Sequence, residues 1–260
     1  MTFSLHVRTA VVACLAIAIA GAARPAAADT TTVQAEIASS VTTAFDQLAK
    51  LYEKRHAGVT IAAKYLGGQV IQGDVEADNP IDVVVVGKSQ TDKLAEHIGP
   101  PVAILTNREV VLIPKGSTKV KSLADLGNPG IKVALGNTDS AVGTLARGVL
   151  KKAVLDPAYG SDFASKVRAN TTFEGTSGAE VVDAVASGKV DAAIAFVSDV
   201  DPSRFTGVAI PPAINVDSIY FAFVPKAAKN AKIGAEIVKL LARPQGLAIL
   251  HSYRFLPPPK

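Results

Sequence analysis

One unit recurs at least six times along the chain: a β-rich run, a turn containing Gly, Ser or Thr, and an amphipathic helix. This repetition restricts the possible folds more than any other feature of the sequence. Residues 83–86 are four consecutive valines within the run 81–86, a pattern typical of a strand buried on both faces of a parallel sheet. Residues 41–56 carry apolar side chains at helical spacing behind Ser39 and Ser40, which predicts a helix with a serine cap. The alternation predicts an α/β fold with parallel sheets and right-handed crossovers.

The same reasoning predicts the other elements. Further strands are expected at residues 32–38, 59–66, 110–113, 131–135, 171–174, 190–197 and 219–224. Further helices are expected from Gly67 to about residue 78, and at 87–98, 141–155, 179–187, 231–242 and the C-terminal end, with a helical turn at 122–126. Asp82 begins a buried strand, and we expect it to accept backbone hydrogen bonds at a loop entry.

Residues 1–28 have the order of a secretory signal. Arg8 is followed by the uncharged, mostly apolar stretch 9–22, and then by Ala26-Ala27-Ala28 as an Ala-x-Ala cleavage site. The apolar stretch is shorter than the roughly 20 residues that cross a bilayer. Cys14 lies inside this stretch, so we interpret it as part of the signal rather than as a lipoprotein cysteine. We therefore expect cleavage near Ala28 and a periplasmic protein without cysteine.

The composition of the remaining 232 residues excludes several function classes. The chain has 27 Lys and Arg against 23 Asp and Glu, and without Arg8 and Arg24 the balance is 25 against 23, so no nucleic-acid partner is expected. No later apolar run has membrane-spanning length, and Trp is absent. His56, His97 and His251 lack metal-ligand spacing, and no nucleotide-binding or catalytic motif occurs, so we predict no metal, no cofactor and no catalytic residue.

Five predicted strand-to-helix turns are the candidate binding elements. In α/β sheets such turns lie at the carboxyl ends of strands, where small molecules bind. Free N–H groups at helix starts attract anions without needing Lys or Arg. Ser and Thr are also favoured there simply as helix caps, and both interpretations stay open. The turns are residues 39–40, 67–69, 87–89, 139–143 and 176–178.

Arg108 precedes the predicted strand 110–113 and has two interpretations. It faces an anionic ligand near a hinge, or it pairs with Glu109 or Asp217 at the surface.

The chain resembles the periplasmic molybdate-binding proteins of ABC importers, within the type 2 solute-binding proteins. The resemblance covers nearly the whole chain after the signal, and the order of the matching segments is more specific than any one of them. These segments are residues 38–42, 51–54, 73–83, 107–116, 122–126, 133–136, 188–195 and 198–199.

The resemblance implies a two-lobe α/β fold of type 2, with parallel-rich sheets flanked by helices and the ligand in a cleft between the lobes. Lobe 1 would comprise residues 29–106 and 220–260, and lobe 2 residues 107–219. Two family contacts would be changed, because Gly67-Gly68 falls where the family has a second serine and Phe196 where it has a tyrosine hydroxyl. The predicted ligand-binding residues are Ser39, Ser40, Gly67, Gly68, Gln69, Lys88, Arg108, Ser140, Val142, Ser177, Gly178 and Phe196.

The resulting hypothesis is a monomeric periplasmic protein that captures a small, molybdate-like oxyanion for the membrane subunits of an ABC importer. The alternative is a binder or isomerase of a small polycarboxylate such as aconitate, an activity found on a similar fold. An isomerase would need a proton-transfer residue, with Lys88, Asp139 or a histidine as candidates.

Overall fold

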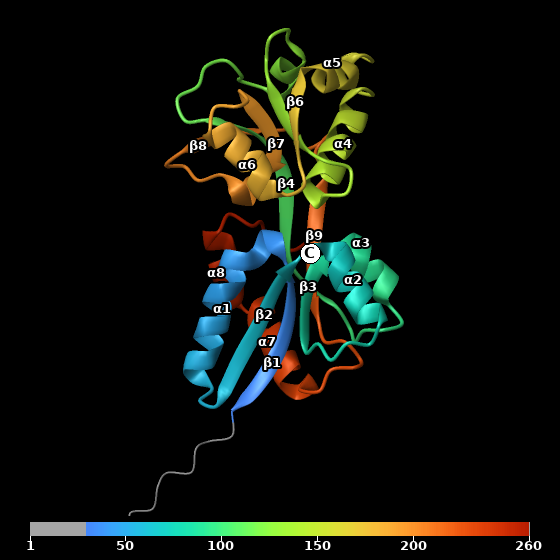
Figure 1. The fold of residues 1–260 in the computed structure, drawn as a ribbon, viewed down its shortest axis with the longest axis vertical. Coiled ribbons are helices and arrows are strands. Elements are labelled where there is room, and N and C mark those ends of the chain that lie inside the picture. Colours follow the sequence, from blue (N-terminus) through green and yellow to red (C-terminus); the bar gives the residue numbers. More distant parts are fainter. Residues whose placement is uncertain (1–29, 260) are drawn as a thin grey trace, which may run out of the picture.

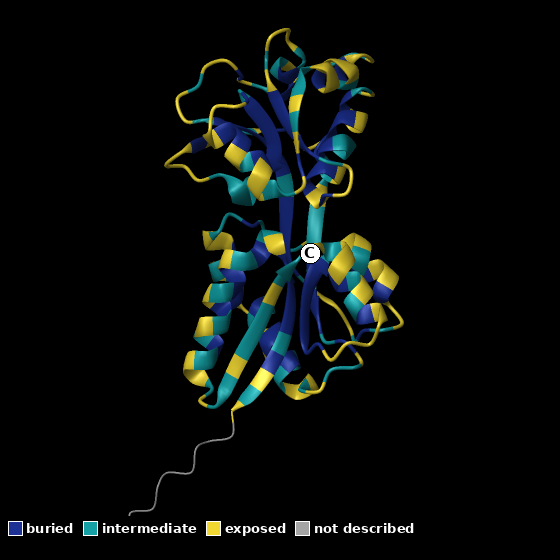
Figure 2. Ribbon diagram, viewed as in Figure 1, coloured by how far each residue is buried: buried dark blue, intermediate teal, exposed yellow. Residues whose placement is uncertain are grey.

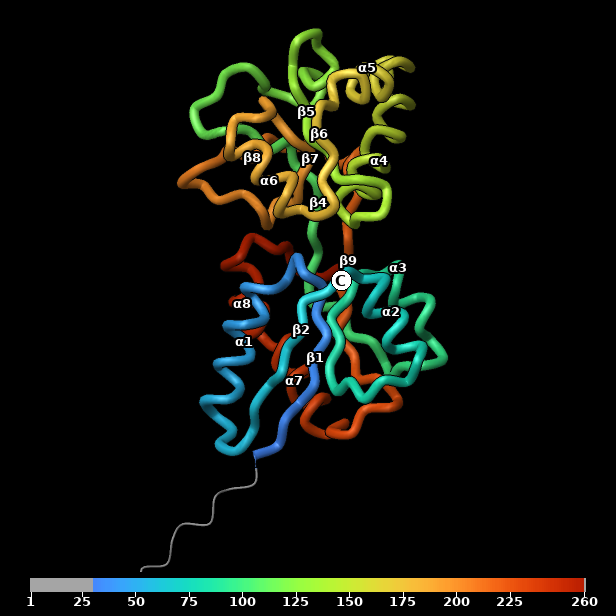
Figure 3. Tube along the Cα trace, in the orientation of Figure 1, coloured from blue at the N-terminus to red at the C-terminus, as the bar shows by residue number. Residues whose placement is uncertain are grey.

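The computed structural model describes residues 30–259, and the predicted signal at 1–28 lies outside the described residues. Figure 1 shows two lobes joined by two long strands, β4 (Val102–Pro114) and β9 (Asp217–Phe223). The chain completes most of the first lobe, enters the second along β4, and returns along β9 (Figure 3). The predicted α/β class and two-lobe arrangement are confirmed.

The first lobe is built on the strand order β2-β1-β3-β9-β4. Strands β1 (Thr31–Ala38), β2 (Val59–Leu66) and β3 (Val83–Gly87) are parallel, whereas β9 is antiparallel to both β3 and β4. Helices α1 (Thr42–Arg55), α7 (Ala231–Ala242) and α8 (Pro244–Ser252) contribute to one apolar core of this lobe. Helix α2 (Gly68–Glu76) contributes to a second core, beside the short α3 (Lys88–Thr91).

The second lobe continues the sheet through the later half of β4. There β4 pairs with β7 (Ala192–Phe196) and β8 (Phe205–Ala209), and β5 (Val133–Gly136) lies between β7 and β6 (Thr171–Gly175). Helices α4 (Ala141–Ala153) and α5 (Phe163–Asn170) pack on one apolar core. Helix α6 (Gly178–Ala186) packs on another, so both faces of the sheet are covered.

The central strands are mostly buried and the helices expose one face each, whereas the edge strand β2 has no buried residue (Figure 2). The predicted run of valines is buried throughout in β3, as a strand covered on both sides requires. Asp82 behaves as predicted, because its carboxylate accepts the backbone N–H groups of Gln34 at 2.9 Å and Asn230 at 2.6 Å. It thereby ties β1 to the start of α7.

Some predicted elements were wrong in detail. Ser39 and Ser40 do not cap α1, because Ser39–Val41 forms a 3₁₀ turn and Val41 is the N-cap without any side-chain hydrogen bond. The segment expected as a helix at 87–98 is α-helical only as far as Thr91. A 3₁₀ turn follows, and its Leu94 is buried in the apolar core. Strand β4 begins at Val102, eight residues before the expected 110. The polar residues Thr106, Asn107 and Glu109 interrupt the apolar pattern although they are buried, so the pattern did not indicate the first half of this strand.

Candidate functional site

The carboxyl ends of β1, β2 and β3 meet at one edge of the first lobe. In register, Ala38 of β1 lies beside Leu66 of β2, and Ile37 lies beside Val85 of β3. The turns that follow these strands are therefore neighbours. They contain the predicted residues Ser39, Ser40, Gly67, Gly68, Gln69 and Lys88.

The second lobe repeats this arrangement with β5, β6 and β7. Gly136 of β5 lies beside Gly175 of β6, and Ala134 lies beside Ala193 of β7, so the turns after all three strands share an edge. Those turns contain Ser140, Ser177 and Asp199.

Both edges border the same crossing segment. Tyr220 of β9 pairs with Gly87 at the end of β3, and Glu109 of β4 pairs with Phe196 at the end of β7. Between these points, residues 105–108 of β4 pair with 217–220 of β9. The topology thus brings the two sets of strand ends to opposite sides of one short two-stranded connection, and we call this region the candidate site.

Hydroxyl groups from distant parts of the chain meet in the candidate site. The Ser40 Oγ and Tyr220 OH are 2.9 Å apart, and the Asn107 side-chain amide donates to the Ser198 Oγ at 2.9 Å. Burial raises the pKa of Tyr220, and its contacts with Ser40 and Ser218 lower it in part. Tyr220 was not predicted as a site residue. Its apolar strand gave no signal, because a tyrosine in a buried strand is ordinarily a core residue.

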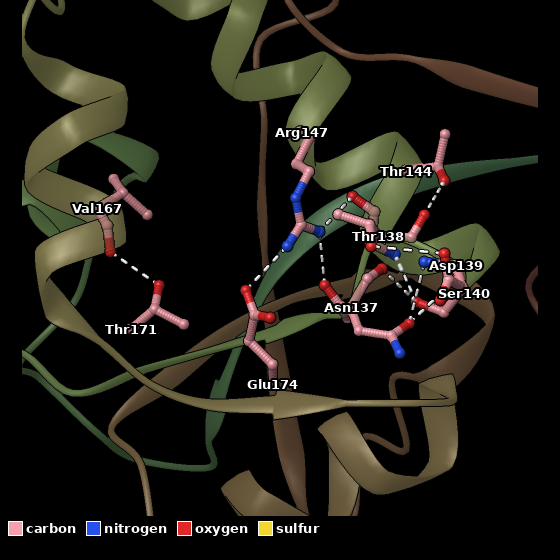
Figure 4. A network of polar contacts seen from close by, with 11 residues as sticks. Asn137, Thr138, Asp139, Ser140, Thr144, Arg147, Val167, Thr171 and Glu174 are labelled. Carbon is pink, nitrogen blue, oxygen red and sulfur yellow. Dashed lines mark hydrogen bonds and ion pairs between the residues drawn. The ribbon is translucent and has the colours of Figure 1, made fainter.

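The turn before α4 is held by close backbone approach and by its own polar groups (Figure 4). The Ser140 Oγ accepts from the Gly143 N–H at 3.1 Å, so Ser140 is a helix cap. The Ser140 N–H donates to the Asn137 Oδ1 at 2.9 Å. Gly136 and Gly143 permit this packing, since a Cβ on Gly143 would lie 1.9 Å from the Asn137 carbonyl oxygen. Val142 is buried, so only its backbone can serve a ligand.

Arg147 braces the same turn from inside α4 (Figure 4). Its Nη1 donates to the Gly136 carbonyl at 2.7 Å and to the Gly143 carbonyl at 3.1 Å, and its Nη2 pairs with Glu174 at 2.8 Å. Arg147 therefore fixes where the N–H groups at the start of α4 point. No sequence pattern indicated this role.

The start of α6 already carries carboxylates. The Ser177 Oγ accepts from the Glu180 N–H at 3.3 Å, which is the cap interpretation of this turn. The Glu180 carboxylate in return accepts from the Thr176 N–H at 2.8 Å. The Asp199 Oδ2 lies 3.4 Å from the position that a Cβ on Gly178 would take.

Glu109 and Asp199 form an acidic pair in the candidate site, in which Glu109 is fully buried and Asp199 half-buried. Both carboxylate oxygens of Glu109 and the Oδ2 of Asp199 are buried without a hydrogen-bond partner in the described chain. Burial raises the pKa of Glu109 well above its usual range, and the charge of Asp199 raises it further. Burial also raises the pKa of Asp199 to about 6, against the partial lowering by the Phe196 N–H and the Ser198 hydroxyl.

Three predicted site residues, Arg108, Lys88 and Phe196, do not offer a free group there, whereas the side chain of a fourth, Gln69, is not engaged by any other described residue. Arg108 makes a two-bond ion pair with Asp217 at 3.0 Å, which is the surface alternative. Lys88 is exposed and pairs with Asp92 at 2.7 Å. Phe196 is buried in the apolar core, and Gln69 is exposed on the first turn of α2 without a hydrogen bond.

Residues 30–259 also bear on two other types of site. No described helix is long and apolar enough to cross a membrane. The described part of the chain holds no group of three or more His, Cys, Asp or Glu side chains suited to a metal ion.

Residues 34–256 match the family model of the bacterial extracellular solute-binding proteins. The chain belongs to this family. It is 24% identical over 228 residues to the molybdate-binding protein ModA of Mycobacterium tuberculosis, covering 85% of this chain and 83% of the relative.

Two solved structures share the fold. The sulfate-binding protein SubI of M. tuberculosis has a TM-score of 0.74 and 14% identity, and 87% of each chain is covered. L-phospholactate-bound PEB3, a Campylobacter jejuni protein, has a TM-score of 0.70 and 15% identity, covering 86% of this chain and 99% of PEB3.

Proposed function

We propose that this protein is the solute-capturing component of an ABC importer and binds a small tetrahedral oxyanion, the class that includes molybdate, sulfate and phosphate. The observation that carries the proposal is the meeting of two sets of strand ends and helix starts at the crossing of β4 and β9. This placement corresponds to the position of small-molecule sites in α/β sheets. The ligands named for ModA and SubI support the oxyanion class.

The chemistry of the candidate site supports an anion held by hydrogen bonds. The first N–H groups of a helix have no intrahelical acceptor, and the positive end of the helix dipole lies beside them. Helix α2 begins at Gly68 without a side-chain cap, and α4 offers the N–H groups of Ala141 and Val142. The Ser40 and Tyr220 hydroxyls add donors that rotate to suit the ligand. Tyr220 on β9 thus offers a hydroxyl group in place of the one that Phe196 lacks.

The polycarboxylate alternative stays a proposal and is supported by two observations. PEB3, a structural neighbour, was solved with L-phospholactate, a ligand that carries a carboxylate beside its phosphate. The pair of Glu109 and Asp199 supplies buried carboxyls with raised pKa values, as proton transfer requires. An aconitate isomerase would use these rather than Lys88 or Asp139, which are exposed.

We further propose that the protein acts as a monomer in the periplasm after cleavage near Ala28, with the membrane subunits of the importer as partners. The support is the family membership, because extracellular capture of a solute requires export.

The decisive experiment is calorimetric titration of residues 29–260 with molybdate, tungstate, sulfate, phosphate, citrate and aconitate. We expect at least one inorganic oxyanion to bind, and Ser40→Ala to weaken it about tenfold, the effect of one hydrogen bond to a charged group. Ser187→Ala is the matched control, since Ser187 lies beyond the opposite end of α6. Binding of carboxylates alone would contradict the oxyanion proposal, and turnover of aconitate would establish the enzyme.

A further inference from the structure

Three buried carboxylate oxygens of Glu109 and Asp199 lack a hydrogen-bond partner in the described chain. Among residues 30–259, four buried side-chain polar atoms lack a hydrogen bond, and three of them are the carboxylate oxygens of Glu109 and Asp199. The fourth is on Glu36, in the first lobe. Buried carboxylates without a partner are strongly disfavoured, so such atoms ordinarily mark a place where another group binds.

The acidic pair lies beside the connection between the two lobes. Glu109 belongs to the crossing segment and lies in register with Phe196, the last residue of β7. Asp199 follows three residues later and lies against Gly178 at the start of α6. The charges of both carboxylates act on the Tyr220 hydroxyl, which contacts Ser40 of the first lobe. The pair therefore lies beside the start of α6 and near the Tyr220 hydroxyl that contacts the first lobe.

Neighbouring elements supply no counter-charge to this pair. Among the nearby charges, that of Asp199 raises the pKa of the Glu109 carboxyl. The charged groups around them are already engaged: Arg108 with Asp217, Arg147 with Glu174, Lys152 with the Asn215 carbonyl, and Glu180 with Thr176. In its ionised form the pair can only accept hydrogen bonds, so what it then lacks is a donor.

Resting on the proposed function, we propose that Glu109 and Asp199 accept a hydrogen bond from the bound oxyanion and thereby select one that keeps a proton. Hydrogen phosphate is the simplest member of this class, because it retains an O–H at neutral and alkaline pH. Sulfate and molybdate carry no proton there, and their oxygens would face the carboxylates with repulsion and no bond. The helix N–H groups would take the bare oxygens, and the acidic pair would take the O–H. Discrimination by a buried group that is left unpaired with the wrong ligand is strong.

The first test is the ratio of affinities at pH 8. Calorimetry on residues 29–260 should give a dissociation constant for phosphate at least about tenfold lower than for sulfate or molybdate. Glu109→Gln replaces an acceptor with an amide that also donates, so it should weaken phosphate, strengthen sulfate and lower the ratio about tenfold or more. Asp199→Asn is the second variant, so the outcome does not depend on the folding of one protein. Glu36→Gln is the matched control, a buried glutamate with an unpartnered oxygen away from the site.

The second test is pH. As the pH falls from 8 to 5.5, the pair takes up a proton and gains a donor, so sulfate, which has no titrating group in this range, should bind more tightly. A purely structural role for the pair would leave the sulfate affinity unchanged, and Asp199→Asn should lose most of the change, because the pKa of Asp199, about 6, lies within this range. If sulfate or molybdate binds as tightly as phosphate, or both variants keep the wild-type ratio, the inference is wrong while the proposed function stands. If no inorganic oxyanion binds, both are wrong.

Discussion

Gly143 is the third residue of α4, and Gly143→Ala tests how the turn before this helix is held. An added Cβ would lie 1.9 Å from the Asn137 carbonyl oxygen and 2.4 Å from that of Gly136. A carbon and a carbonyl oxygen in close contact stand about 3.3 Å apart, so the loop must shift by about 1.4 Å.

The magnitude follows from what the shift breaks. It removes the Ser140 cap on the Gly143 N–H at 3.1 Å, for which a typical cost is about 1 kcal/mol. It also strains the bond from the Ser140 N–H to Asn137 at 2.9 Å, for another ~1 kcal/mol. Overpacking adds about 1–3 kcal/mol, and the better helix propensity of alanine returns up to about 1 kcal/mol. The expected loss of stability is therefore about 2–4 kcal/mol, together with weaker anion binding.

Chemical denaturation gives the stability, and calorimetry gives the binding. Gly73→Ala is the matched control, because Gly73 also lies inside a helix and a Cβ there would meet no atom within 4 Å. That variant should gain about 0.5–1 kcal/mol. A Gly143→Ala protein that loses less than 1 kcal/mol and binds normally would refute the close-packing argument for this turn.

Three further outcomes are expected. Tyr220→Phe removes the hydroxyl beside Ser40 and should weaken oxyanion binding about tenfold in calorimetry, with little change in unfolding. Asp82→Ala leaves two backbone N–H groups without their acceptor and should cost about 2–4 kcal/mol in denaturant unfolding. Burial raises the pKa of Asp199 from 3.8 to about 6, so its contribution to stability falls as pH rises from about 4 to about 6. Asp199→Asn should therefore be more stable than the wild type at pH 8, by up to about 3 kcal/mol, and the difference should vanish near pH 4.

The sequence predicted well those elements whose pattern is local. The valine run of β3 and the turn before α4 follow from neighbouring residues, and the role of Asp82 was predicted from its place at a strand start although its partners are distant in sequence. Helix α5 (Phe163–Asn170) and strand β8 (Phe205–Ala209) were not predicted. Both carry few buried residues, so their apolar periodicity is faint.

The candidate site was less predictable because its key contacts join distant residues. Ser40 has the sequence context of a helix cap, but its hydroxyl meets Tyr220, 180 residues later. Glu109 precedes an apolar run and resembles a strand-end surface charge, yet it is fully buried. Polar residues that are buried without local partners carry no periodic signal, so only the crossing of β4 and β9 reveals them.

The electrostatics of the two lobes explain how an anion site can contain an acidic pair. A helix start stabilises one nearby negative charge, and at α6 that place is taken by Glu180 and by the neighbouring Asp199. The first turns of α2 and α4 contain no carboxylate, so they are the ends left to hold the bare oxygens of a ligand. The second lobe thus attracts through α4 and selects through the acidic pair. With these separate roles, the backbone N–H groups determine which size of oxyanion binds, and Glu109 determines whether the bound oxyanion must carry a proton.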